Sequence, residues 1–288
     1  MRQFLSITAL AFVLCFPALS DPARDQDLDT LRAKAGRGDA AAQSELGFMY
    51  YRGQGVPRDF AKAREWLRKA AEAGDGKGQL NLGLMYYQGD GMPRDFAEAM
   101  KWFRKAAEGG DPRAQFGVGS MYHEGESVPR DHAEAMKWLR KAAAQGLMEA
   151  QYNLGVMYQQ GDGVPRDYAE AMKWYHRAAE AGYPRAQYNL GGMYHQGSGI
   201  PRDDHEAEKW YRRAAELGLS DAQDHLGVMY TEGEGLPRDY VTAYMWFSLA
   251  AARGNEEARK NLDIVERNLT ADERAEAQRM ARDWRPTP

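Results

Sequence analysis

Cysteine is almost absent from this sequence. Its 288 residues contain one cysteine, Cys15, which falls in a segment that we expect to be removed from the mature chain. The rest of the sequence therefore offers no disulfide framework and no thiolate ligands for a metal. We expect the folded protein to depend on side-chain packing for its stability.

An excess of positive charge is also lacking. The formal net charge is −4, and charged residues of both signs, 28% of the total, are mixed along the chain. A protein that binds nucleic acid through phosphates needs a broad positive field. We therefore predict no nucleic-acid partner.

Recognisable catalytic motifs are missing as well. The six histidines show neither HExxH nor another zinc-ligand spacing, and no serine begins SxxK or lies in GxSxG. The loop glycines match no phosphate-binding motif. We predict no catalytic residues, no metal ligands and no cofactor.

Long hydrophobic runs are limited to the N-terminus, where Phe4 to Phe16 follow Arg2. This run of 13 residues is short for a bilayer span, and Ala18 and Ser20 supply the small residues of a cleavage site. We predict a signal peptide over 1–20 with cleavage after Ser20, a periplasmic or secreted protein, and no membrane span after signal removal. The alternative is a retained transmembrane anchor.

What the sequence has in abundance is one repeated phrase. Residues 161–175 read GDGVPRDYAEAMKWY, and residues 89–103 read GDGMPRDFAEAMKWF. Residues of four types recur every 36 positions, which indicates one structural unit copied six times. Examples are Pro57, Pro93, Pro129, Pro165, Pro201 and Pro237; Trp66, Trp102, Trp138, Trp174, Trp210 and Trp246; and Gly47, Gly83, Gly119, Gly155, Gly191 and Gly227.

Each copy predicts two helices joined by a turn. In residues 150–158, Ala150, Leu154 and Met157 share one helical face, so we expect a first helix, helix A. The Gly-rich stretch 161–165 ends it. Asp167, with Glu170 three residues later, predicts the capping box of a second helix, helix B.

Glycine in the middle of helix A is costly, by about 1 kcal/mol relative to alanine. We therefore expect helix B to approach closely at Gly155 and its equivalents. Neither helix buries its apolar face alone, so successive hairpins must stack. Helix B of the sixth copy is apolar on its outer side, and we expect the C-terminal helices to cover that side.

These residues resemble the Sel1-like repeat family, which is related to the tetratricopeptide repeats. The resemblance is clearest in AQYNLGVMYQQGDGVPRDYAEAMKWYHRAAEAG, residues 150–182. It implies an all-α fold, a right-handed α-solenoid of stacked antiparallel helical hairpins. The predicted divisions are a signal peptide (1–20), an N-terminal linker and capping helix (21–37), C-terminal capping helices and tail (254–288), and six repeats at 38–73, 74–109, 110–145, 146–181, 182–217 and 218–253.

In tetratricopeptide-like arrays the A helices line the concave surface, so the resemblance also implies where a partner binds. Aromatic residues supply contact area there, and asparagines pair with a peptide main chain. In the alternative interpretation the same aromatic side chains pack against the neighbouring A helix. The predicted protein- or peptide-binding residues are Phe48, Tyr51, Leu80, Asn81, Leu84, Tyr87, Phe116, Tyr152, Asn153, Val156, Tyr188 and Asn189.

The sequence thus predicts a monomeric, exported, non-enzymatic adaptor that binds a protein or peptide partner. By the resemblance, such an adaptor works in the bacterial cell envelope, in regulation of a sensor, in polymer export or assembly, or in host contact. The alternative is an enzyme that acts on cell-wall material or β-lactams, an activity associated with cysteine-rich members of the family.

Overall fold

The computed structural model describes residues 23–286, with side chains from residue 27 onward. Over this range the chain folds into helices and contains no strand, which confirms the predicted all-α class. The predicted signal peptide lies outside the described residues. No helix between residues 23 and 286 is long and apolar enough to cross a bilayer.

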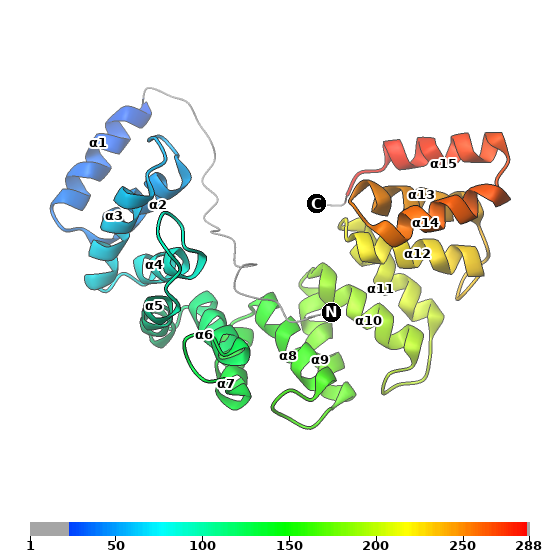
Figure 1. Ribbon diagram of the computed structural model, residues 1–288, viewed down its shortest axis with the longest axis horizontal. Coiled ribbons are helices and arrows are strands. Elements are labelled where there is room, and N and C mark those ends of the chain that lie inside the picture. The colour runs from blue at the N-terminus through cyan, green and yellow to red at the C-terminus, as the bar shows by residue number, and fades with distance from the viewer. Residues whose placement is uncertain (1–22, 287–288) are drawn as a thin grey trace. The chain divides into compact units, whose positions relative to one another are not determined.

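The helices alternate between the A and B positions of the repeat (Figure 1). The A helices are α2 (Ala40–Arg52), α4 (Gly76–Gln88), α6 (Pro112–Glu124), α8 (Met148–Gln160), α10 (Pro184–Gln196) and α12 (Ser220–Glu232). The B helices are α3 (Phe60–Glu72), α5 (Phe96–Glu108), α7 (His132–Ala144), α9 (Tyr168–Glu180), α11 (Asp204–Glu216) and α13 (Tyr240–Ala252). The flanking elements are α1 (Ala23–Gly36), α14 (Glu256–Val265), the 3₁₀ helix η2 (Glu266–Asn268) and α15 (Ala271–Asp283).

The predicted aspartate caps start the B helices. The Asp95 carboxylate, for example, accepts a hydrogen bond from the backbone N–H of Glu98 at 3.0 Å. The other half of the predicted box is wrong at this helix. The Glu98 side chain does not turn back to the cap, because its two oxygens accept from Lys101 Nζ at 2.7 Å and Trp102 Nε1 at 3.0 Å.

The predicted close approach at the central glycines is confirmed in all six hairpins. A Cβ at Gly83 would lie 2.7 Å from Cδ1 of Phe103, and a Cβ at Gly155 would lie 2.5 Å from Cε1 of Tyr175. The residue after the repeated tryptophan therefore fills the space that glycine leaves. These partners are Leu67, Phe103, Leu139, Tyr175, Tyr211 and Phe247.

Buried glutamines join each hairpin to the helix before it. Gln115 Nε2 donates to the carbonyl of Ala107 at 3.2 Å, and Gln223 Nε2 donates to Ala215 at 3.0 Å. In each case the glutamine is in helix A and the carbonyl is near the end of the preceding B helix. The equivalent donors are Gln79, Gln151 and Gln187, and Gln43 donates in the same way to Ala35 of α1.

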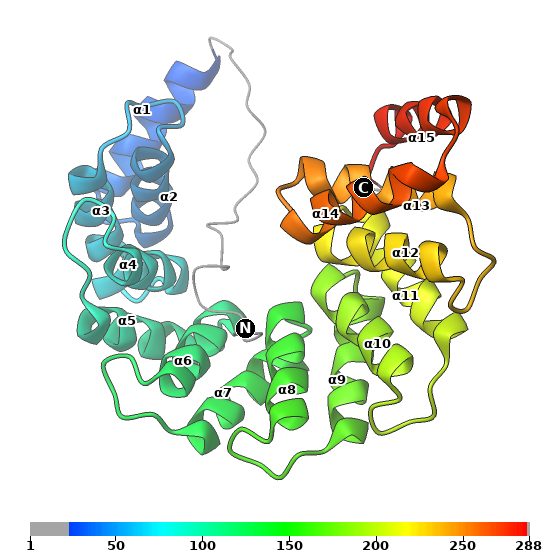
Figure 2. The ribbon, with the colours of Figure 1, turned by 45° about the vertical axis from the view of Figure 1, so that its right-hand side comes forward.

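The chain divides into two compact units at residues 153 and 154, within α8. In the first unit α2 pairs with α3, α4 with α5, and α6 with α7, and α3 and α5 each pack on the A helix that follows them. In the second unit α10 pairs with α11 and α12 with α13, and α11 packs on α12. The loops between A and B helices follow one another along one edge of this second unit (Figure 2).

Additional helices cover the two ends of the array. At the first repeat α1 packs on α2, where Ala35 is buried with Ala42 and Leu46. After the last repeat α14 and α15 both pack on α13. Met280, Ala281 and Trp284 contact the cluster that contains Trp246, so the expected cover over the apolar side of α13 is confirmed.

Candidate functional site

Most of the predicted partner-binding side chains are buried. Of the twelve, only Tyr51 and Tyr188 keep an intermediate exposure. A buried side chain has little surface to offer a partner, so the other ten side chains mainly pack within the array in the unbound chain, and their part in binding stays a prediction. The buried residues are Phe48, Leu80, Asn81, Leu84, Tyr87, Phe116, Tyr152, Asn153, Val156 and Asn189.

The physical reason is the close spacing of the helices. In the first unit α2 contacts α4 directly, as well as its own B helix. Tyr87 is closed off by its own hairpin, because its ring packs 5.3 Å from Phe96 and 6.4 Å from Phe103 of α5, centroid to centroid. At Tyr87 the aromatic packing is therefore within the hairpin, whereas the alternative interpretation expected packing against the neighbouring A helix.

One stretch of the A helices remains partly open, on α10 and α12. Tyr188, Gly192, His225 and Val228 are all of intermediate exposure there. The rings of Tyr188 and His225 meet edge to face, with centroids 5.2 Å apart. Gly192 carries no side chain on this face. A Cβ added there would lie 3.5 Å from its nearest neighbour, the Tyr211 hydroxyl. We call these four residues the α10–α12 face.

A buried amide borders this face. Asn189 is 8% exposed, and its Nδ2 has no hydrogen-bond partner in the structure. The amide at the equivalent position of α14 is paired, since Asn261 Nδ2 donates to Asp224 Oδ1 at 3.0 Å. An unpaired buried donor is costly, by about 1–3 kcal/mol, and this cost favours an acceptor brought by another molecule.

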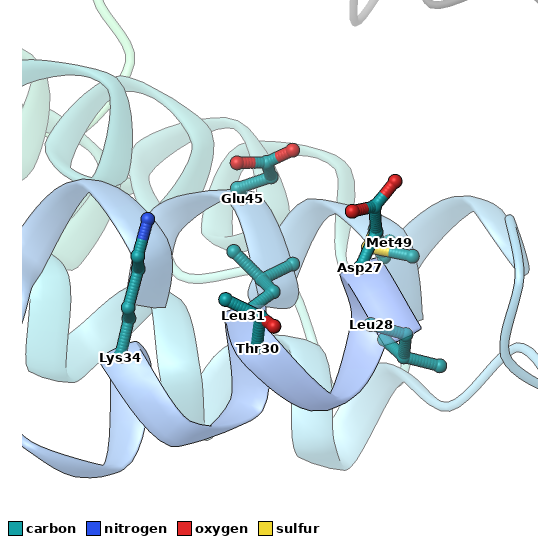
Figure 3. A pocket seen from close by; sticks show the side chains of 7 residues that line it. All are labelled: Asp27, Leu28, Thr30, Leu31, Lys34, Glu45 and Met49. Atoms are coloured by element: carbon teal, nitrogen blue, oxygen red, sulfur yellow. The ribbon is translucent and has the colours of Figure 1, made fainter. Parts of the chain in front are cut away.

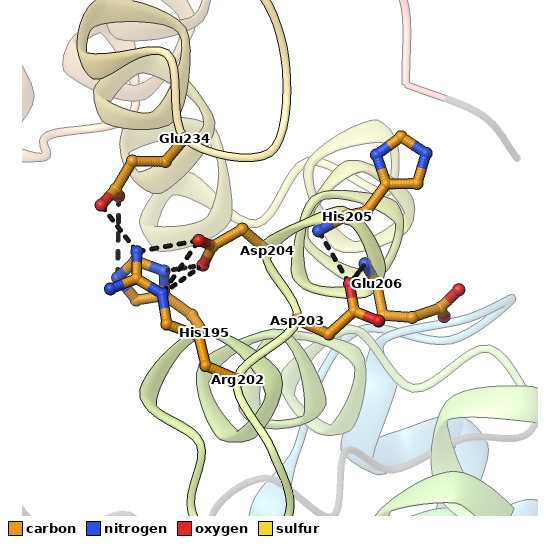
Figure 4. Close-up of polar contacts among 7 residues, drawn as sticks. All are labelled: His195, Arg202, Asp203, Asp204, His205, Glu206 and Glu234. Carbon is orange, nitrogen blue, oxygen red and sulfur yellow. Dashed lines mark hydrogen bonds and ion pairs between the residues drawn. The ribbon is translucent and has the colours of Figure 1, made fainter.

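Charged side chains gather where α10 passes into α11 (Figure 4). Asp204 accepts from His195 Nδ1 at 2.9 Å and from Arg202 Nε at 2.9 Å. Arg202 also donates to Glu234 of the next loop at 2.7 Å. The pKa of Asp204 is lowered, chiefly by its hydrogen bond with Arg202 and also by the one with His195. These charged side chains are paired with one another, so their role is to hold the loop between α10 and α11 against the next loop.

A shallow recess of about 260 Å³ lies between α1 and α2 (Figure 3). It forms where α1 stands in place of a complete preceding hairpin. Leu28, Leu31 and Met49 line it together with Asp27, Thr30, Lys34 and Glu45. Its mixed lining favours no single ligand chemistry.

The histidines show what sequence reasoning missed. His195 is paired with Asp204, and His123 with His132 at 3.2 Å between their Nδ1 atoms, across the A–B loop of each repeat. The eight intervening residues belong to no familiar motif, so only the fold brings each pair together. Within residues 27–286 no group of three or more side chains is placed to hold a metal ion.

The comparisons with known proteins agree with this architecture. The family model described as the Sel1 repeat matches six consecutive segments, 40–75, 76–111, 112–147, 149–183, 184–219 and 220–255. The chain belongs to the Sel1 repeat family. Sel1 repeats, like tetratricopeptide repeats, form a scaffold for protein–protein interaction.

Solved Sel1 structures resemble the chain over most of its length. It is 40% identical to a Sel1 repeat protein from Oxalobacter formigenes, with a TM-score of 0.76, over 82% of this chain and 68% of that one. It is 33% identical to c5321, a protective antigen of uropathogenic Escherichia coli strains with an SLR fold, with a TM-score of 0.56, over 88% of this chain and 62% of that one. No curated protein is significantly similar to it. Neither the geometry nor these relatives support the alternative of a cell-wall or β-lactam enzyme.

Proposed function

We propose that this Sel1 repeat protein is an exported, non-enzymatic adaptor that holds a protein or peptide segment against its α10–α12 face, in a bacterial cell envelope. The observation that carries the proposal is the unpaired amide of Asn189 beside side chains that remain half-exposed. In the other described repeats the residues equivalent to Tyr188 and Gly192 are buried, apart from Val228 of the face itself.

The chemistry of the face suits an extended peptide. Tyr188 and His225 offer flat ring surface, and Val228 offers an apolar contact, all at low cost in side-chain entropy. The Asn189 Nδ2 donor matches a main-chain carbonyl, which any peptide supplies regardless of its sequence. Gly192 leaves room for a backbone to lie close to α10.

Export is the second part of the proposal, and it rests on the N-terminal sequence. Arg2, the apolar run to Phe16 and the small residues Ala18 and Ser20 have the order of a secretory signal. Cell fractionation followed by N-terminal sequencing tests this part. The expected result is a mature chain outside the cytoplasm that begins at Asp21; a cytoplasmic protein that retains Met1 would contradict it.

Site-specific photo-cross-linking in the native host tests the binding face. Arg185 is exposed and lies on the same side of α10 as Asn189 and Gly192. A photo-cross-linking residue at position 185 is expected to capture one discrete partner. The same residue at Lys209, exposed on α11, is the matched control and is expected to capture no such partner.

Blocking variants then decide whether capture depends on the face. Gly192→Gln places a polar side chain on the α10–α12 face, and it is expected to reduce capture from position 185. Gly192→Ala adds only a methyl group and should reduce it far less. If Gly192→Gln leaves capture unchanged while the helicity is intact, the α10–α12 face is not the binding site.

A further inference from the structure

Two histidine side chains face each other in the third repeat. His123 is in the last turn of α6, and His132 is the first residue of α7. Their Nδ1 atoms are 3.2 Å apart, and the ring centroids are 5.0 Å apart with the planes inclined by 65°. Both side chains are half-buried, so the loop between α6 and α7 holds them in place without sealing them from water.

The same two positions carry different pairs in the other repeats. The first repeat has Tyr51 and Phe60, with centroids 5.5 Å apart, and the second has Tyr87 and Phe96, 5.3 Å apart. An aromatic contact therefore suffices for the fold at this point. In the third repeat both positions are histidine, so the ring contact remains and two nitrogen atoms come within 3.2 Å of each other.

We propose that His123 and His132 form a two-histidine site for a divalent transition metal ion, with Zn²⁺ as the representative ion. Imidazole nitrogen is a preferred ligand of Zn²⁺ and binds it at about 2.0–2.1 Å. Two such ligands of a tetrahedral ion lie about 3.3 Å apart, close to the 3.2 Å between the two Nδ1 atoms. Little rearrangement is needed for both to bind one ion.

A metal ion held by these two histidines is expected to exchange readily with solution. No third metal-ligating side chain joins a cluster of this kind within residues 27–286, so water fills the remaining coordination positions. The fifth repeat marks the contrast, because there His195 meets Asp204, whose carboxylate is already paired with Arg202. That pair is satisfied without a metal.

Calorimetric titration of the full chain with Zn²⁺ tests the proposal, on protein that carries no polyhistidine tag. The wild-type chain is expected to bind one Zn²⁺ near neutral pH and to bind it more weakly at acidic pH, because protons compete with the metal ion for imidazole nitrogen. The double variant His123→Tyr, His132→Phe copies the aromatic pair of the second repeat and should keep the fold. It is expected to lower Zn²⁺ affinity by roughly tenfold or more.

The control is His195→Gln, which removes a histidine from the same repeat position two units further on. It is expected to bind Zn²⁺ as the wild type does. The proposal is overturned if the wild-type chain binds no Zn²⁺, if the double variant binds with unchanged affinity while its helical spectrum is intact, or if His195→Gln lowers the affinity as much as the double variant.

Discussion

Two adjacent glycines in α10 show how far the role of a residue depends on its surroundings. A Cβ at Gly191 would lie 2.7 Å from Cδ1 of Tyr211, inside contact distance of a buried ring. At Gly192 the nearest atom is the Tyr211 hydroxyl at 3.5 Å, which is ordinary contact. The sequence predicted the first glycine from its 36-residue recurrence, and it gave no reason for the second.

Alanine at each of these positions should therefore act in opposite directions. Gly191→Ala is expected to destabilise the protein by about 1–3 kcal/mol, because the methyl group overpacks against Tyr211. Gly192→Ala is expected to stabilise it by up to about 1 kcal/mol through helix propensity. Chemical denaturation of the two variants measures both changes, and an equal loss at the two sites would contradict the packing described for Tyr211.

Asp204 accepts hydrogen bonds from both His195 and Arg202 at the loop edge of the second unit. Its folded-state pKa is lowered, chiefly by Arg202, so the folded protein binds fewer protons here than the unfolded chain does. Its contribution to stability is therefore complete above the unfolded pKa of about 3.9 and is lost as the pH falls through the folded pKa.

Asp204→Asn should reveal that contribution through its pH dependence. At pH near 7 the variant is expected to be less stable than the wild type by up to about 1 kcal/mol. The difference should shrink as the pH falls below about 3.9. Urea unfolding at several pH values checks this, with Asp203→Asn as the comparison because Asp203 caps α11 outside the ion pair. A difference for Asp204→Asn that is constant with pH would contradict the assignment.

At the scale of elements, the joint between hairpins is a buried glutamine. The sequence repeats this glutamine every 36 residues, a signal that the helical pattern did not explain. Both polar atoms of the Gln115 amide are hydrogen-bonded, because its Oε1 also accepts from Gln145 at 2.9 Å. Gln187 donates in the same way to Ala179, yet its Oε1 has no partner.

This difference predicts unequal costs for the same substitution. Gln115→Leu is expected to destabilise the protein by about 1–3 kcal/mol, because it removes the two hydrogen bonds that Gln115 makes with Ala107 and Gln145. Gln187→Leu should cost less, since it also removes a buried oxygen that was already unsatisfied. Thermal unfolding of the two variants gives the order, and the reverse order would show that the glutamine bonds do not set the joint.

At the scale of the molecule, the last repeat of a stacked array needs a cover over its apolar side. Trp246 and Leu249 of α13 are 3% and 7% exposed, and side chains of the C-terminal helix α15 pack against the cluster that contains them. In the earlier B helices the position of Leu249 holds lysine or arginine, and those side chains stay in water above a tryptophan ring, as Lys141 does 4.1 Å from the centroid of Trp138. Terminal repeats of stacked folds require a cover of this kind.

Removal of α15 should therefore expose an apolar surface. Deletion of residues 271–288 is expected to lower the melting temperature and to increase binding of a hydrophobic dye. Deletion of residues 285–288 alone keeps Trp284 and serves as the control. Unchanged melting and dye binding after the longer deletion would mean that α15 does not cover α13.

The sequence by itself determined the repeat, its two helices, the aspartate caps, the close approach at the central glycines and the cover at the C-terminal end. These features follow from periodicity and local backbone chemistry, which act over a few residues and recur in every copy. Only the tertiary structure decided which repeated side chains face a neighbouring helix and which face water. Burial depends on how closely successive A helices approach, and local periodicity does not encode that distance. For the same reason Tyr152 and Phe116 proved buried, while Tyr188 stayed half-open beside Gly192.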